Sequence, residues 1–232
     1  MSFYRKIFPK KNTLLIVIHV EDKKQALRNS QIAKEEGVDG IFLINHSIPS
    51  GELLFHYDEV RMRFPDLWIG LNFLDLPTIA AIQVLPRTAN GLWVDNAGIV
   101  ESPHESTAQA AYYKDLRTRS WKNDQLYFGS IAFKYQMPVK DPARAAELAI
   151  PYVDIITTSG AGTGIAAEVE KIRIMKNAIG EHPLAIASGV TPENVSEYLE
   201  YADCFLVATG VSKSHTELDA SRVRKLVQKI SP

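Results

Sequence analysis

Short apolar runs alternate with longer, more polar segments along almost the whole chain. Continuous apolar runs of this kind are typical of strands in a parallel sheet that is covered on both faces. The runs predict strands over residues 14–20, 40–44, 67–72, 91–94, 126–132, 153–157, 184–187 and 204–208. The segments that follow them predict helices over residues 23–36, 52–63, 77–85, 106–119, 142–150, 166–179, 192–200 and 220–230.

Three of these helices have start signals in the sequence. In Asp141-Pro142 and Thr191-Pro192, a side chain that can cap a helix stands before a proline at the first helical position. Proline is favoured there because the N–H that it lacks would have no partner within the helix. Asp219 is a further candidate cap, for the last helix.

The alternation of eight strands with eight helices predicts a parallel α/β fold. Eight units in 232 residues favour a closed barrel, because a TIM barrel typically has about 250 residues. An open doubly wound sheet would predict a Gly-x-Gly-x-x-Gly turn after the first strand, and residues 19–22 offer none. The sequence therefore predicts a single (β/α)8 TIM barrel over residues 1–232.

Two glycine-bearing segments follow the seventh and eighth predicted strands. In many barrels these two loops form a phosphate site from backbone N–H groups and a helix N-terminus. Glycine lets the backbone approach phosphate oxygens without an intervening Cβ. The predicted phosphate-binding residues are Ser188, Gly189, Val190, Thr209, Gly210 and Val211.

A third glycine-rich segment, residues 158–164, follows the sixth strand. It could cover a ligand, cradle an anion or simply turn the chain. Thr158, Gly160 and Gly162 are therefore candidate ligand contacts.

Barrel enzymes place their chemistry at the C-terminal ends of the strands, which makes Lys134, Asp95 and His19 the candidate catalytic residues. Lys134 could bind a phosphate or carboxylate, polarise a carbonyl, or form a Schiff base if desolvated; otherwise it is a solvated loop lysine. Asp95 could orient a hydroxyl, act as a general base or bind a metal, or it could be a turn residue. His19 could transfer protons or fill a layer of the barrel.

Other polar residues near the strand ends extend this list. Asn45 and Asn72 could bind hydroxyl groups or a base edge, and His46 and His56 are expected on the surface. No cluster has a metal-ligand spacing, so no cofactor or structural metal is predicted, although Asp95 with Glu21 could hold Mg²⁺.

Composition narrows the classes of partner. A net charge of −1 produces no strong field that would favour nucleic acid or an anionic membrane. No apolar run approaches the roughly 18 residues of a transmembrane helix, and the basic N-terminus lacks an apolar signal region, so we expect a cytoplasmic protein. The single cysteine, Cys204, lies in an apolar run and is expected to be a buried small hydrophobe. A homo-oligomer is compatible with the fold, but no residue argues for one.

Residues 157–164 and 187–195, with 203–210 and 219–227, resemble the BtpA/SgcQ family. The resemblance covers most of the chain and is specific from about Lys134 onward. It implies a TIM barrel similar to the ribulose-phosphate-binding barrels, with a phosphate site at Gly189, Val190, Gly210 and Val211. The founding member of the family is associated with photosystem I assembly, and the wider family also occurs where there is no photosynthesis.

These observations favour an enzyme that acts on a phosphorylated sugar, ribosyl compound or nucleotide, by isomerase, lyase or glycosidic-bond chemistry. The alternative is a non-catalytic assembly or regulatory protein that retains the phosphate pocket. Two departures from the family pattern motivate this alternative. The first strand leads straight into its helix, without the usual Pro- and Gly-rich loop. Near its lysine the family tends to carry an aspartate and a histidine, whereas this chain has Ser130 and Tyr135 nearby. A third, weaker alternative is a purely structural barrel with incidental glycines.

Overall fold

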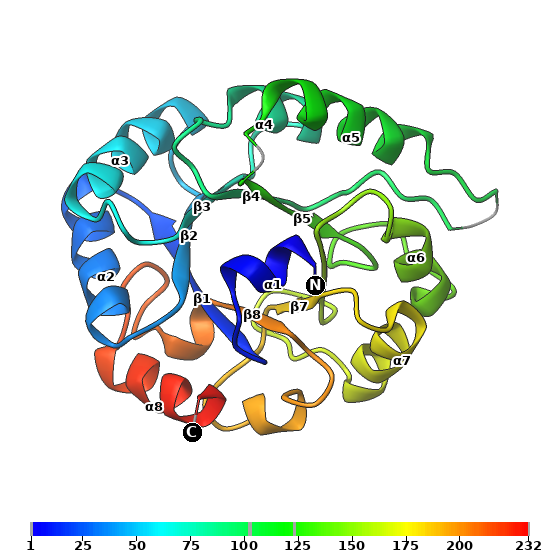
Figure 1. Cartoon of the computed structure of the whole chain (residues 1–232). Helices are drawn as coiled ribbons and strands as arrows, with labels where there is room; N and C mark the ends of the chain where they lie inside the picture. Colours follow the sequence, from blue (N-terminus) through cyan, green and yellow to red (C-terminus); the bar gives the residue numbers. More distant parts are fainter. Residues whose placement is uncertain (1, 102–103, 123, 232) are drawn as a thin grey trace.

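The computed structural model describes residues 2–101, 104–122 and 124–231, and eight parallel strands close into a barrel (Figure 1). β1 pairs with both β2 and β8, and every other strand pairs with its neighbours in the sequence. The predicted (β/α)8 fold is therefore confirmed. The strands are β1 (Thr13–Val20), β2 (Gly40–Asn45), β3 (Ile69–Phe73), β4 (Gly91–Val94), β5 (Leu126–Ser130), β6 (Ile155–Ser159), β7 (Leu184–Ala187) and β8 (Cys204–Val207).

Helices surround the barrel, as Figure 1 shows. Two of the predicted caps are confirmed, because Asp141 accepts from the backbone N–H of Arg144 and Asp219 accepts from that of Arg222. The outer helices are α2 (Lys23–Glu35), α3 (Ser50–Arg63), α4 (Thr78–Val84), α5 (Ala108–Ser120), α6 (Pro142–Ala149), α7 (Val169–Ile179) and α8 (Ala220–Ile230).

The helix predicted over 192–200 is wrong: this segment contains only a short 3₁₀ turn, η1 (Val195–Glu197). Thr191 does not cap an α-helix, because its Oγ1 accepts from the backbone N–H of Glu193 at 3.2 Å. Asn194 Oδ1 in turn accepts from the backbone N–H of Thr191 at 2.8 Å. Side chain to backbone bonds of this kind compete with helix formation. A second 3₁₀ turn, η2 (Thr209–Val211), follows β8.

Two apolar cores lie on the two sides of the barrel wall. One fills the space between the strands and the outer helices. The other fills the barrel interior, where Cys204 is fully buried, as expected. Its large side chains include Phe42, Trp68, Trp93 and Phe128.

A short helix that the sequence analysis missed, α1 (Phe3–Ile7), crosses the N-terminal end of the barrel (Figure 1). Tyr4 and Phe8 are buried against the barrel interior. The Tyr4 hydroxyl lies 2.8 Å from Thr13 Oγ1 and 2.9 Å from the carbonyl oxygen of Asp203. α1 therefore covers the N-terminal end of the barrel interior.

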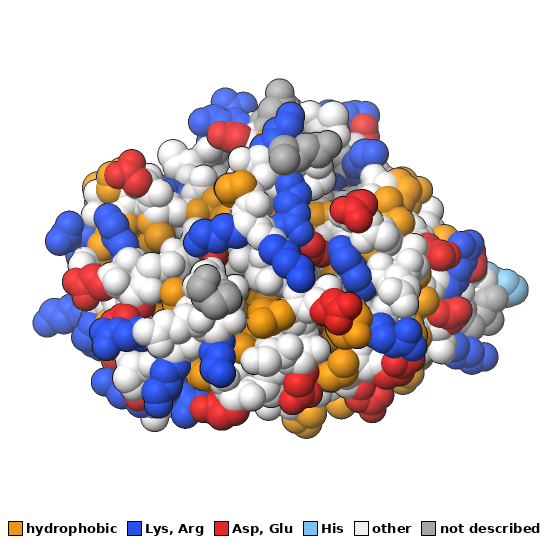
Figure 2. All heavy atoms as spheres, turned by 60° about the horizontal axis from the view of Figure 1, so that its bottom comes forward, with side chains coloured by type: hydrophobic (Ala, Val, Ile, Leu, Met, Phe, Trp, Pro, Cys, Tyr) orange, Lys and Arg blue, Asp and Glu red, His pale blue; other side chains and the backbone are white. Residues whose placement is uncertain are grey.

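The surface carries charges of both signs. On the face in Figure 2, lysine and arginine side chains stand among aspartate and glutamate side chains, with scattered hydrophobic patches between them. Some of these charges join helices, as in the pair between Arg224 of α8 and Glu36 at the end of α2, 2.7 Å apart. Within the described part of the chain, every helix is too short or too polar to span a bilayer.

Candidate active site

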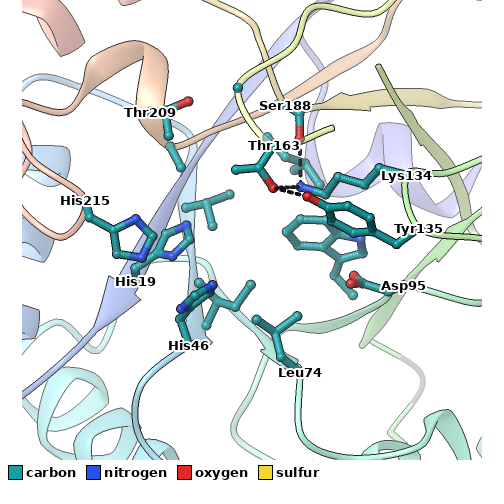
Figure 3. Close-up of a pocket in the computed structure, with 16 residues that line it drawn as sticks. His19, His46, Leu74, Asp95, Lys134, Tyr135, Thr163, Ser188, Thr209 and His215 are labelled. Atoms are coloured by element: carbon teal, nitrogen blue, oxygen red, sulfur yellow. Dashed lines mark hydrogen bonds between the residues drawn. The ribbon is translucent and has the colours of Figure 1, made fainter. Parts of the chain in front are cut away.

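The C-terminal end of the barrel holds a cavity of about 230 Å³ (Figure 3). Its deeper lining is apolar, with Val17, Ile44, Trp93 and Leu206 among its residues. The candidate catalytic residues Lys134, Asp95 and His19 all line this cavity, although they come from three different strand ends. The other polar residues of the lining are His46, Tyr135, Thr163, Ser188, Thr209 and His215.

Lys134 follows β5 and reaches into the cavity toward the loops after β6 and β7 (Figure 3). Its Nζ donates to Ser188 Oγ at 2.9 Å and to Thr163 Oγ1 at 3.2 Å. Burial lowers the pKa of Lys134, and the charge of Asp95 opposes this shift. Neutral hydroxyl groups therefore hold an amine that its surroundings make less basic than an exposed lysine.

The backbone around Lys134 is strained. Ala132, Tyr135 and Ser188 are the non-glycine residues of the described chain with positive φ, at 48°, 64° and 85°. The first two flank Lys134, and the third receives its hydrogen bond. Such conformations cost about 1–3 kcal/mol each and cluster at functional sites. This clustering singles out Lys134 among the polar residues of the cavity.

Lys171 of α7 stabilises the strained loop after β5 by hydrogen bonds to its backbone. Its Nζ donates to the carbonyl oxygens of Ala132 at 2.6 Å and Ser159 at 2.8 Å, and burial lowers its pKa to about 8. The backbone N–H of Lys134 donates to Ser159 Oγ at 2.9 Å. Thr158, a predicted ligand contact, is instead buried and donates to the same carbonyl of Ala132 at 3.2 Å. These bonds fix the position from which Lys134 enters the cavity.

Asp95 follows β4, and Asn72 of β3 donates to its Oδ1 at 3.2 Å. Burial raises the pKa of Asp95, although the Asn72 hydrogen bond and the charge of Lys134 oppose the shift. A carboxyl group with a raised pKa can exchange protons with a substrate nearer to neutral pH. Asn72 thus orients Asp95. Asn45 lies outside the cavity lining and braces the neighbouring loops, through its bond to Asp75 at 2.6 Å.

Three histidines form the opposite wall of the cavity (Figure 3). The ring centroids are 4.5 Å apart for His19 and His215, 4.9 Å for His46 and His215, and 5.6 Å for His19 and His46. His46 is exposed, as expected, but it faces this cavity. His215 escaped the sequence analysis because it lies in a polar loop after β8, without a local motif.

His56 is the one histidine whose expected surface position is wrong. It is only 6% exposed and shares the buried face of α3 with Leu53, Tyr57 and Val60. Residues three and four apart on a helix lie on the same face. Because Leu53 and Val60 are apolar and stand three and four positions from His56, His56 lies on the face of α3 that packs against the barrel.

We expect His19 to stay neutral at pH 6. Burial, followed by the neighbouring His215, His46 and Lys134, lowers its pKa to about 4. Between pH 6.5 and 4 the unfolded chain then binds the extra proton, so stability falls as the pH drops through this range, by at most about 3 kcal/mol. Nitrogen-15 NMR of the histidine side chains measures this pKa, and the variant His19→Asn should have a shallower loss of stability. A His19 pKa near 6.5 would contradict this prediction.

The predicted phosphate residues divide into two groups. Ser188 and Thr209 line the cavity, whereas the side chains of Val190 and Val211 are buried in the core. The hydrogen bonds of the described loops and turns leave the backbone N–H groups of Thr209 and Gly210 unused. Such groups at the start of a helical turn are available to an anion.

Glycines allow the loops after β6, β7 and β8 to pack closely against one another. A Cβ on Gly189 would lie 2.2 Å from the backbone N of Ala166, and φ at Gly189 is +69°. A Cβ on Gly210 would lie 1.9 Å from the carbonyl oxygen of Val190. Gly160 is equally confined, and Gly162 lies outside the cavity lining.

Among residues 2–101, 104–122 and 124–231, no group of three or more His, Cys, Asp or Glu side chains is placed to hold a metal ion. Glu21 does not line the cavity with Asp95, so the pair considered for Mg²⁺ is not brought together there.

The C-terminal part of the chain is similar to a known protein family. Residues 139–232 match the model of the BtpA family, and they include the loops after β6, β7 and β8. The chain is a TIM barrel whose C-terminal part is similar to the BtpA family. An uncharacterised protein of Thermococcus kodakarensis is 33% identical over 78 residues, which are 32% of this chain and 30% of that protein. The BtpA-like barrel thus matches less than a third of the length of this curated relative.

Solved structures resemble the BtpA-like barrel over nearly its full length. Phosphoribosyl anthranilate isomerase from Thermus thermophilus has a TM-score of 0.66 and 14% identity, covering 94% of this chain and 98% of that one. A (S)-3-O-geranylgeranylglyceryl phosphate synthase from Thermoplasma acidophilum, in complex with its substrate sn-glycerol-1-phosphate, has a TM-score of 0.68 and 14% identity, covering 99% and 98%. At these identities the likeness shows the fold alone.

Proposed function

We propose that this BtpA-like barrel is an enzyme that binds a phosphorylated sugar, ribosyl compound or nucleotide in its C-terminal cavity and acts on it. The observation that carries the proposal is the strained and braced loop that presents Lys134 to the cavity, opposite His19 and beside Asp95. The similar folds of phosphoribosyl anthranilate isomerase and of a synthase with bound sn-glycerol-1-phosphate support a phosphorylated substrate.

The phosphate group would bind on the β7–β8 side of the cavity. The hydroxyls of Ser188 and Thr209, which line the cavity, would donate to it, and the unused backbone N–H groups of Thr209 and of the adjacent Gly210 would supply further donors. Hydrogen bonds to a charged acceptor are stronger than those between neutral groups. Binding energy from the phosphate would then position the reactive end of the substrate among Lys134, Asp95 and His19.

Proton transfer would fall to Asp95 and His19. Burial raises the pKa of Asp95 and lowers that of His19. The two pKa values therefore lie closer together than those of the free side chains, which eases proton exchange between these groups and a substrate. Lys134 would stabilise negative charge that develops on the substrate. Isomerisation, lyase chemistry and glycosidic-bond cleavage all use such groups.

A thermal-unfolding experiment tests the binding part of the proposal. We expect ribose 5-phosphate and inorganic phosphate to raise Tm at matched ionic strength, and ribose to leave it unchanged. A ligand at a hundredfold excess over Kd adds about 2.7 kcal/mol to the unfolding free energy. The variant Ser188→Ala should bind ribose 5-phosphate about tenfold more weakly, because a hydrogen bond to a charged group contributes about 1.5–3 kcal/mol.

The matched control is Ser120→Ala, at the exposed end of α5, which should bind like the native protein. Equal shifts for ribose and ribose 5-phosphate, or no shift with either phosphate compound at millimolar concentration, would overturn the phosphate site.

One observation favours the non-catalytic alternative. Tyr135 and Met137, in the loop beside the cavity, are 80% and 87% exposed, and exposed apolar surface often marks an interaction site. A turnover screen with phosphorylated sugars separates the two functions. Turnover that disappears in Lys134→Ala supports the enzyme, and binding without turnover of any compound supports the assembly or regulatory protein.

A further inference from the structure

Lys134 has a different environment from the ion-paired lysines of this chain. Lys10, Lys23 and Lys176 each place Nζ within 2.7–2.8 Å of a carboxylate oxygen. In the described chain no carboxylate lies within 4.0 Å of Lys134 Nζ, and its partners are two hydroxyl groups. A hydroxyl can accept from an ammonium ion and can equally donate to a neutral amine.

The position of Lys134 makes the neutral amine more accessible than it is in an exposed lysine. The side chain enters a cavity with an apolar floor, and burial disfavours the charged form. The neutral amine is the form that attacks carbon, and desolvated lysines are the ones that form Schiff bases.

The loop geometry fixes the direction of the amine. Lys171 holds the backbone at the Ala132 carbonyl and Ser159 holds it at the Lys134 N–H, while Ser188 and Thr163 bond to the Lys134 Nζ. A nucleophile held by supporting hydrogen bonds meets its target with little loss of entropy. The same hydroxyls lie beside the predicted phosphate position, so a phosphorylated ligand would lie within reach of the amine.

Asp95 lines the same cavity and can supply a proton. Burial favours its neutral form, and the Asn72 amide fixes its Oδ1. Imine formation needs such an acid, because the carbonyl oxygen has to leave as water.

We infer that Lys134 is a nucleophile that forms an imine with a phosphorylated aldehyde or ketone. This inference rests on the proposed function and names its substrate class and first chemical step.

The step balances with the groups of the cavity. The lone pair of neutral Nζ forms a bond to the carbonyl carbon, and the π electrons of the carbonyl move to its oxygen. That oxygen takes a proton from Asp95, and the nitrogen returns one to the carboxylate, which gives a neutral carbinolamine. Asp95 then protonates the hydroxyl group, which leaves as water. The products are a protonated imine, one water molecule and the Asp95 carboxylate, with no change in oxidation state.

Reductive trapping tests this step without knowledge of the natural substrate. Pyridoxal 5′-phosphate, which carries both an aldehyde and a phosphate group, is added with sodium borohydride, and the labelled peptide is identified by mass spectrometry. D-glyceraldehyde 3-phosphate with sodium cyanoborohydride serves as a smaller second probe. We expect Lys134 to be labelled at least tenfold faster than Lys10, and inorganic phosphate to protect it.

Two variants test the roles of the Lys134 amine and of the Asp95 carboxyl group separately. Lys134→Arg keeps a long basic side chain but cannot form the imine, so the label should disappear from this peptide while the circular dichroism stays native. Asp95→Asn removes the acid, and labelling of Lys134 should slow at least tenfold. Lys10→Arg, at a lysine paired with Asp39, is the matched control and should leave the labelling of Lys134 unchanged.

The outcomes distinguish the two proposals. A Tm shift with ribose 5-phosphate but no Lys134 adduct with either probe would overturn the imine step and leave the phosphate site standing. Labelling of Lys134 at the rate of Lys10, without protection by phosphate, would also overturn it. Absence of both the shift and the adduct would overturn the proposed function as well.

Discussion

Replacing Asp203 with alanine is expected to lower the unfolding free energy by about 3–5 kcal/mol, because it leaves partly buried cationic partners unpaired. Asp203 joins several elements at the N-terminal end of the barrel. Its Oδ2 accepts from Lys176 Nζ at 2.7 Å and from the backbone N–H of Leu184 at 2.9 Å. Its Oδ1 pairs with Arg5, which lies on α1. Urea unfolding measures the loss.

The control for this prediction is Asp66→Ala, at an exposed position with no ion pair in the described structure. An exposed residue of this kind should change stability by no more than about 0.5 kcal/mol. A loss below about 1 kcal/mol in Asp203→Ala would mean that its charges are already well solvated in the folded protein.

The substitution Gly210→Ala is expected to lower stability by about 3 kcal/mol, near the upper end of the usual cost of overpacking. The added Cβ would lie 1.9 Å from the carbonyl oxygen of Val190, so the loops after β7 and β8 have to separate. Because these loops carry the proposed phosphate donors, affinity for ribose 5-phosphate should fall at least tenfold, which calorimetric titration measures.

Gly51→Ala gives the matched comparison, because no atom lies within 4 Å of the added Cβ and the residue stands in α3. Alanine is the better helix former, so this variant should be more stable by up to about 1 kcal/mol. Native stability in Gly210→Ala would show that the two loops move apart at little cost.

The strands and most helices could be predicted because each depends on local signals. Buried strands of a parallel barrel are apolar throughout, and Asp141 and Asp219 cap helices through residues close to them in the sequence. Thr191 carries the same kind of signal, but Asn194 bonds back to the chain and replaces the helix with a turn. The α1 segment has five residues, too few to show a helical period, and it is stabilised by contacts with residues 13 and 203.

The candidate site was predictable only in part, for a similar reason. The rule that strand ends carry the chemistry selected Lys134, Asp95 and His19, which the structure brings to one cavity. The supporting roles of Asn72 and Lys171 depend on contacts across neighbouring strands and helices. The glycines at 189 and 210 were visible, but only the structure shows that their lack of a Cβ lets two loops pack together.

A crystal structure of the protein soaked in ribose 5-phosphate would show whether the phosphate binds in the C-terminal cavity. We expect phosphate density between the hydroxyls of Ser188 and Thr209, within hydrogen-bond distance of the backbone N–H of Gly210, and the sugar directed toward Lys134 and Asp95. Density for the phosphate at another surface, with the cavity containing only water at a saturating ligand concentration, would contradict it.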